Sequence, residues 1–263
     1  MLTVLDSIPS WRTLRAELGS RSLGFVPTLG GLHAGHAALV ERSVAENERT
    51  LVSVFLNPTQ FDEPTDLAAY PADLEADRSL VESLGADYLL CPSRDEIYPD
   101  RYRYRVAEGE LSRTLCGEHR PGHFDGVLTV VMKLLQIVSP TRAYFGEKDH
   151  QQLQLVRGMV EAFFLPMEIV ACATVRESDG LAASSRNRKL DPEQRRLAPA
   201  FPALLRGAPR PGDVRRRLEE AGFGVDYVED VTGRRYAAVR LGPVRLIDNV
   251  PLSEVERDGG GEV

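Results

Sequence analysis

The stretch LGFVPTLGGLHAGH, from Leu23 to His36, takes an apolar run through a glycine-rich turn into the start of a helical pattern. The run Leu23–Thr28 predicts a buried strand, and a helix is expected to open near Gly35. His33 and His36 lie at that opening, where backbone N–H groups are expected to be free and the helix dipole favours an anion. The stretch therefore predicts a phosphate-binding strand–loop–helix unit. The alternative is two surface-loop histidines that meet by chance.

Composition is that of an ordinary soluble protein. The 263 residues are 43% hydrophobic, which is enough for one large domain or for one medium and one small domain. The net charge of −7 argues against nucleic acid as a partner. No apolar run approaches the ~20 residues of a membrane span, and no basic segment followed by an apolar one opens the chain. We therefore expect no membrane partner and a cytoplasmic location.

The three cysteines, Cys91, Cys116 and Cys172, are far apart, which favours reduced thiols over a disulfide framework. Cys116, His119 and His123 have a spacing that resembles a zinc motif. However, Pro121 and Gly122 interrupt it and no fourth ligand with recognised spacing follows. A tight turn that leads into a helix is the favoured interpretation.

Strand and helix patterns alternate over the first two thirds of the chain, which is typical of a parallel sheet covered on both faces. The fold class predicted is α/β: a Rossmann-like doubly wound parallel sheet with a second, smaller α+β domain. We place the domains at residues 1–174 and 175–263. The strands expected in the first domain are Leu23–Thr28, Leu51–Leu56, Asp87–Cys91, Arg142–Phe145 and Met167–Ala173.

Helical periodicity supports this reading. The segment Asp73–Leu84 places Leu74, Leu80, Val81 and Leu84 on one side, and the helix from Asp149 does so with Val156, Met159, Val160, Phe163 and Phe164. The segment Phe124–Val138 is apolar nearly all round, so it is expected to be buried, within the chain or between subunits. In the second domain we expect helices in Asp191–Arg206 and Pro211–Ala221, and strands at Val225–Val231, Arg234–Leu241 and Val244–Val250.

Loops that follow the strands are rich in chemically capable residues, and such loops converge at the ligand site of a doubly wound sheet. Lys148 offers a point charge for phosphate, and Ser184, Ser185 and Arg186 offer hydroxyl and guanidinium donors. Asp149 or Glu147 could contact Mg²⁺. The competing interpretations are a solvated helix start for Glu147 and Lys148, and a helix cap or turn for Ser184–Asn187.

Two uncharged amides, Gln60 and Gln152, lie in the same set of loops and are suited to orienting a small hydroxy acid. Their alternative is ordinary solvation, and Asn57-Pro58 is also a turn signal. The chain has neither a Walker loop nor a G-x-G-x-x-G motif. Phosphate would therefore be bound by histidines, lysine and the Ser-Ser-Arg loop.

In this combination the sequence resembles the pantothenate synthetase (pantoate–β-alanine ligase) family of the H-x-G-H nucleotidyltransferase superfamily. The likeness runs from Gly24 to Leu190 and resumes weakly at Arg245–Asn249. The motifs that carry it are Pro27–His36, Asn57–Phe61, Ala69–Pro71, Arg120–Gly126, Phe145–Leu153 and Asp179–Asn187.

The resemblance implies a ligation in which ATP and (R)-pantoate give pantoyl adenylate and pyrophosphate, after which β-alanine displaces AMP to give pantothenate. It implies a homodimer, Mg²⁺ with the ATP, and a small domain that closes over the adenylate. His36 would be the proton donor, with His33, Lys148 and Arg186 also catalytic. Gln60 and Gln152 would bind pantoate, and Gln60 also β-alanine. The implied ATP site comprises Leu29, Gly30, Gly31, Leu32, His33, Ala34, Gly35, His36, Gly146, Glu147, Lys148, Asp149, Val175, Ala183, Ser184, Ser185 and Arg186.

Leu29, Ala34 and Ala183 depart from the residues usual in the family, at places of apolar or backbone contact, and the second domain is short. Two alternatives stay open. One is another H-x-G-H adenylyl or cytidylyl transferase, which would leave the nucleotide on its product. The other is a nucleotide-binding protein that has lost ligation, with its second domain serving a partner.

Overall fold

The computed structural model describes residues 1–62 and 64–255. The chain divides into two compact units, the first spanning Met1–Ala173 and the second beginning at Thr174. Residues 256–263 of the second predicted domain lie outside the described residues.

The first unit contains a parallel sheet of six strands in the order β1-β4-β3-β2-β5-β6. This order confirms the predicted doubly wound α/β fold. The strands are β1 (Thr3–Leu5), β2 (Leu23–Thr28), β3 (Arg49–Val54), β4 (Tyr88–Leu90), β5 (Arg142–Gly146) and β6 (Glu168–Cys172).

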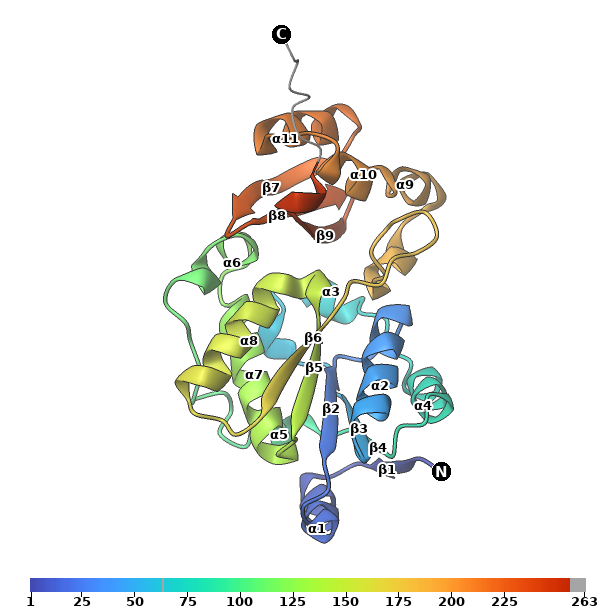
Figure 1. Ribbon diagram of the computed structural model, residues 1–263, viewed down its shortest axis with the longest axis vertical. Helices are drawn as coiled ribbons and strands as arrows, with labels where there is room; N and C mark the ends of the chain where they lie inside the picture. Colours follow the sequence, from blue (N-terminus) through green and yellow to red (C-terminus); the bar gives the residue numbers. More distant parts are fainter. Residues whose placement is uncertain (63, 256–263) are drawn as a thin grey trace. The chain divides into compact units, whose positions relative to one another are not determined.

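Helices cover both faces of this sheet. Figure 1 shows α7 and α8 on one face and α2 and α4 on the other. The helical elements of the unit are α1 (Ile8–Leu18), α2 (Ala34–Glu46), η1 (Pro58–Gln60), α3 (Pro64–Ala68), α4 (Leu74–Ser83), α5 (Arg94–Ile97), η2 (Leu111–Arg113), α6 (Cys116–His119), α7 (His123–Val138), η3 (Glu147–Asp149) and α8 (His150–Ala162).

Strand β2 pairs with β3 on one side and with β5 on the other, so the chain reverses its winding direction between β2 and β5. The carboxyl ends of these parallel strands lie at one edge of the sheet, where doubly wound proteins bind ligands. The loop after β2 leads to His33, and the turn after β5 contains Lys148. The fold therefore brings together two loops that are more than a hundred residues apart in the chain.

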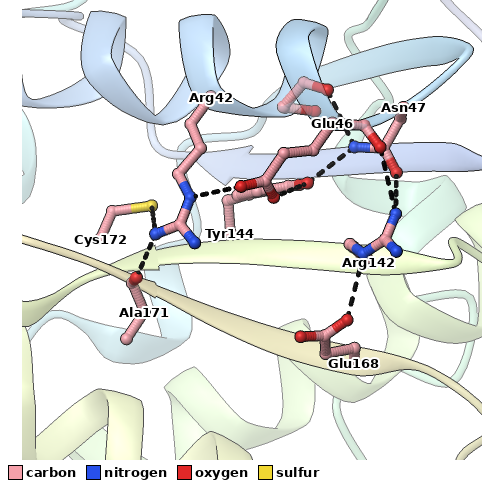
Figure 2. A network of polar contacts seen from close by, with 9 residues as sticks. Arg42, Glu46, Asn47, Arg142, Tyr144, Glu168, Ala171 and Cys172 are labelled. Atoms are coloured by element: carbon pink, nitrogen blue, oxygen red, sulfur yellow. Dashed lines mark hydrogen bonds and ion pairs between the residues drawn. The ribbon is translucent and has the colours of Figure 1, made fainter.

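Polar contacts fasten helix α2 to β5 and β6 (Figure 2). Arg42 donates to Glu46 at 2.9 Å and to the carbonyl of Ala171 at 2.6 Å, and the Tyr144 hydroxyl donates to Glu46 at 2.9 Å. The pKa of Tyr144 is raised to about 12, and burial is the largest cause. This hydroxyl therefore keeps its proton. Arg142 adds a bond to the carbonyl of Glu46. These contacts fix the helix whose first turn contains His36.

Helix α7 is buried along most of its length by elements of its own unit. It packs against α1, α8 and η1, and the Trp11 indole donates to the carbonyl of Ile137 at 3.0 Å. The chain itself accounts for this apolar helix, so its burial gives no support to a subunit interface.

Two parts of the first unit differ from the sequence-based expectation. Strand β1 and helix α1 were not expected; β1 has three residues at the edge of the sheet and shows no buried run. The placement of Phe163 and Phe164 on the buried face of α8 is wrong. That helix ends at Ala162, and the two rings are 57% and 91% exposed. Leu74, on the predicted apolar side of α4, is also exposed.

The second unit is the predicted small α+β domain. Its antiparallel sheet, in the order β7-β8-β9, packs against short helices around Phe201, Leu218 and Val239. The predicted helical segment Asp191–Arg206 is divided in two, with Pro199 at the break. The elements are η4 (Ser185–Lys189), α9 (Pro192–Leu197), α10 (Ala200–Arg206), α11 (Pro211–Glu220), β7 (Gly224–Val231), β8 (Arg234–Leu241), β9 (Val244–Pro251) and η5 (Leu252–Glu254).

Among the helices of the described residues, none combines the length and the apolar character that a membrane span requires.

The packing of α7 on η1 predicts opposite effects for two glycine substitutions. A Cβ at Gly126 would lie 2.3 Å from the carbonyl oxygen of Thr59, whereas one at Gly158 of α8 meets no described atom within 4 Å. Gly126→Ala should lower the free energy of unfolding by roughly 1–3 kcal/mol through overpacking. Gly158→Ala should raise it by roughly 0.5–1 kcal/mol through helix propensity. Urea unfolding measures both; an unchanged or raised free energy of unfolding in Gly126→Ala would contradict the close contact.

Candidate active site

The histidine pair lies where the loop after β2 enters helix α2. His33 is the N-cap residue, and its Nδ1 accepts the N–H of Gly35 at 3.1 Å. Because this nitrogen accepts, the neutral tautomer carries its proton on Nε2, which is then a donor. His36 lies in the first turn of α2, and the two ring centroids are 4.1 Å apart. The structure therefore brings the two predicted histidines together.

His36 is neutral in this environment. Burial first, and then the charge of His33, lowers its pKa from 6.5 to about 3; Lys148 contributes in the same direction and Asp149 opposes it. The buried Nδ1 of His36 has no hydrogen-bond partner in the described part of the chain. Buried polar atoms are nearly always paired, so an unpaired one at a ligand-binding edge is a candidate ligand contact.

Lys148 and Asp149 lie in the turn η3 directly after β5, and both act electrostatically on His36. The Lys148 ammonium lies 3.7 Å from the carboxylate of Asp149, and the lysine side chain is mostly buried. The predicted convergence of this turn with the histidine loop is therefore present. Glu147 and Gly146 occupy the start of the same turn.

The N–H groups of the loop before His33 are engaged, and at the helix opening, where free N–H groups were expected, that of Gly35 donates to Nδ1 of His33. The N–H groups of Gly31 and Leu32 donate to the carboxylate of Asp77 at 2.8 and 2.7 Å. The N–H of Gly30 donates to the Thr28 hydroxyl at 3.2 Å. These N–H groups are engaged because the loop, unlike the helix start, bends back over a buried side chain. The N–H groups of Gly30, Gly31 and Leu32 are therefore committed to partners within the protein.

Gln60 ends the short turn η1 after β3, and its side chain is held in place. Its Oε1 accepts a hydrogen bond from Asn57 at 2.9 Å. Asn57 is fully buried and accepts in turn from the hydroxyls of Thr59 and Tyr98. With its oxygen engaged, the amide nitrogen of Gln60 is the end of this side chain that is a candidate donor to a ligand.

The backbone of Gln60 is fixed as well. Its carbonyl accepts from Nδ1 of His123 at 2.7 Å and from Arg120 at 3.2 Å. Arg120 also donates to Asp62 at 2.8 Å. In place of a zinc ligand, His123 is thus a support for Gln60, and Gly122, with φ of 79°, forms the predicted turn into α7.

Gln152 lies half-buried in the first turn of α8, next to a glutamine with a different role. Gln151 is buried and donates to the carbonyls of Leu111 and Thr114 at 2.8 Å. Gln151 therefore holds the η2–α6 segment, and Gln152 remains the candidate for ligand contact from this helix.

The predicted ATP residues of the second unit form one local structure. Ala183 donates its N–H to the carbonyl of Val175 at 2.9 Å, and Ser184 caps η4 by accepting the N–H of Arg186 at 3.2 Å. Ser185 is buried. The cap-and-turn interpretation of this segment is therefore correct as local structure. A role in binding ATP stays a prediction.

Within residues 1–62 and 64–255, no group of three or more His, Cys, Asp or Glu side chains is placed to hold a metal ion. Mg²⁺ bound with a nucleotide needs no such group, because it keeps several waters and is held largely by phosphate oxygens. The half-exposed carboxylate of Asp149 fits that arrangement.

Three supporting residues were not among the predicted site residues: Asp77, Asn57 and His123. Asn57 carried a signal in the sequence, because an asparagine at the end of an apolar strand must satisfy its side chain when buried. Asp77 carried none, since its partners lie 45 and 46 residues away.

A doubly wound sheet whose switch point holds a histidine pair and a lysine is typical of nucleotide-binding α/β proteins. Comparison with known proteins identifies the family. The profile described as pantoate-beta-alanine ligase matches residues 3–251. The chain belongs to the pantoate–β-alanine ligase family, as the sequence motifs predicted, and is therefore an enzyme of the ligase class.

Curated relatives and a solved structure support this family membership over almost the whole chain. A curated pantothenate synthetase of Coxiella burnetii is 48% identical over 254 residues, covering 97% of this chain and 98% of the relative. One of Bdellovibrio bacteriovorus is 51% identical over 252 residues, covering 96% and 100%. The crystal structure of the pantoate-beta-alanine ligase from Francisella tularensis, complexed with beta-gamma ATP and beta-alanine, aligns with a TM-score of 0.93 and 38% identity, covering 96% and 98%.

The environment of His36 predicts its titration. With a folded pKa of about 3 and an unfolded value near 6.5, the ring stays neutral from pH 8 to about pH 4. Because the unfolded chain binds this proton first, His36 makes the fold less stable as pH falls from 6.5 towards 3. NMR titration of the ring resonances measures the pKa; a midpoint near 6.5 would show that the ring is not desolvated.

Proposed function

We propose that this chain ligates (R)-pantoate and β-alanine to pantothenate through pantoyl adenylate, releasing AMP and pyrophosphate. The observation that carries the proposal is the cluster of His33, His36 and Lys148 at the switch point of a chain that belongs to this family. The relative from Francisella tularensis, crystallised with an ATP compound and β-alanine, supports two of the three substrates.

In the first step a carboxylate oxygen of pantoate attacks the α-phosphorus of ATP, and the bond to the bridging oxygen of pyrophosphate breaks. Charge develops on that oxygen, so donors aimed at it stabilise the transition state. We assign this role to His36, which has an unpaired buried nitrogen, with His33 as a second donor and Lys148 as the fixed cation. Each acts by position and charge, without covalent chemistry.

In the second step the amine of β-alanine attacks the acyl carbon of the adenylate, AMP leaves, and the new amide nitrogen loses a proton. Gln60 is suited to both steps because its oxygen is held by Asn57 and its amide nitrogen can donate to a substrate oxygen. An amide also adds no nucleophile that would compete with the amine. Gln152 is the proposed second contact to pantoate.

Several assignments rest on the sequence motifs alone. These are the contacts of Val175, Ala183, Ser184, Ser185 and Arg186 with ATP, closure of the second unit over the adenylate, and the homodimer. Mg²⁺ would accompany ATP and neutralise phosphate charge, with Asp149 or Glu147 as its nearest protein partners.

Release of AMP tests the proposal. Purified protein with ATP, Mg²⁺, pantoate and β-alanine should release AMP only when both acids are present. His36→Ala should lower kcat by about two orders of magnitude, because it removes a donor to the leaving oxygen. A product that keeps the nucleotide would identify a nucleotidyltransferase instead. ATP binding without AMP release would indicate a chain that has lost ligation.

Gln60→Ala tests the pantoate contact. It should raise the KM for pantoate by about tenfold or more while the KM for ATP stays near the wild-type value, because one substrate hydrogen bond is lost. Gln154→Ala on α8, whose amide contacts His150, is the matched control and should leave both constants unchanged. An unchanged KM for pantoate in Gln60→Ala would place pantoate elsewhere.

A further inference from the structure

The residue that shapes the histidine loop comes from a different helix. Asp77 lies on α4 and its side chain is only 3% exposed. One carboxylate oxygen accepts the N–H of Gly31 at 2.8 Å, and the other accepts the N–H of Leu32 at 2.7 Å. Both oxygens of a buried carboxylate are thus committed to consecutive backbone groups that immediately precede His33.

The loop has a shape that needs such a support. Gly30 and Gly31 have φ angles of 88° and 65°, a region that other residues rarely adopt. A Cβ at Gly31 would lie 2.2 Å from the carbonyl oxygen of Pro71, and the Tyr70 hydroxyl donates to the carbonyl of Gly30 at 3.3 Å. The loop is therefore held between Asp77 and the Tyr70–Pro71 segment, which is part of the family motifs and has no assigned role.

The cost of burying the Asp77 carboxylate must be offset by the groups around it. Burying a carboxylate costs several kcal/mol unless hydrogen bonds compensate, and bonds from N–H groups to a charged acceptor are among the stronger ones. The thiol of Cys91 also lies within electrostatic range of Asp77. Burial, and secondarily Asp77, raises the pKa of this thiol to about 11, so the thiol stays neutral. The charge of Asp77 is therefore compensated by the loop backbone.

We infer that Asp77 is a positioning residue for adenylation: it fixes the Gly30–Leu32 backbone so that His33 and His36 are presented to the phosphates of ATP. This inference rests on the proposed function. It also implies that the N–H groups of Gly31 and Leu32, which donate to Asp77, do not serve as phosphate donors in this chain.

Asp77→Asn is the main test, because the amide keeps the size of the side chain but replaces one acceptor oxygen with a donor facing an N–H group. We expect kcat/KM for ATP to fall by roughly tenfold, and by roughly a hundredfold in Asp77→Ala, since small misplacements of catalytic groups carry costs of that order. The KM for pantoate should change less than twofold. If Asp77→Ala does not fold, the kcat/KM of Asp77→Asn alone tests the inference.

Asp73→Asn is the matched control. It makes the same change at the start of the same helix, where Asp73 caps α4 by accepting the N–H of Ala76 at 3.0 Å; in the described part of the chain it has no hydrogen bond to the loop. It should leave kcat/KM for ATP unchanged. An equal loss in both variants, or a value within twofold of wild type in folded Asp77→Asn, would overturn the inference.

A readout without turnover separates this inference from the proposed function. In ¹H–¹⁵N spectra, Asp77→Asn should move the amide resonances of Gly31 and Leu32 and the ring resonances of His33 and His36, and Asp73→Asn should not. If wild-type protein released no AMP, these shifts would still support the positioning role while the proposed ligation failed. Unmoved histidine resonances in Asp77→Asn would overturn the role.

Discussion

The adjacency of β2 and β5 determines where the candidate site of the first unit lies. Both strands are parallel and end at the same edge, so the loop from Thr28 to His33 and the turn from Gly146 to Asp149 lie together. Moving either strand elsewhere in the order would separate His36 from Lys148, however well each loop were formed. The backbone pairing is therefore the first requirement of the site, and the identities of the side chains are the second.

A second layer of contacts turns this rough placement into a defined geometry. Helix α2 is held at its far end by Arg42 and Glu46, which bond to β5 and β6 (Figure 2). Its near end is held by Asp77 through the loop backbone. His36 lies between these two points. Gln60 is also held at two points: Asn57 fixes its side chain, and His123 fixes its carbonyl. In both cases one of the supports is a buried polar side chain, Asp77 for the histidine loop and Asn57 for Gln60.

Much of this could be predicted from sequence, and the reasons for the failures are physical. Strands such as Leu23–Thr28 are continuous apolar runs because both their faces are covered, and such runs are visible in the sequence. The edge strand β1 has no buried run, and so no signal. Phe163 and Phe164 continue the helical period by chance beyond Ala162, where Phe164 adopts φ of 54° and the chain turns. The histidine motif indicated the candidate site, but Asp77 depends on a contact across 45 residues, and helical periodicity does not report such contacts.

The charge state of the site follows from the same burial. Two imidazolium rings beside Lys148 would repel one another, and desolvation adds to that cost, so His36 is neutral and Lys148 is the cation fixed there. A triphosphate bound at this edge, as proposed, would raise the pKa of His36, because its negative charge favours the protonated ring by the same Coulombic rule. Under the proposed function, the His36 ring, which is neutral without nucleotide, would gain proton affinity when phosphate binds. A histidine can act in this way since its unperturbed pKa is near 6.5, whereas a second lysine would carry its charge, and its repulsion of Lys148, in both states.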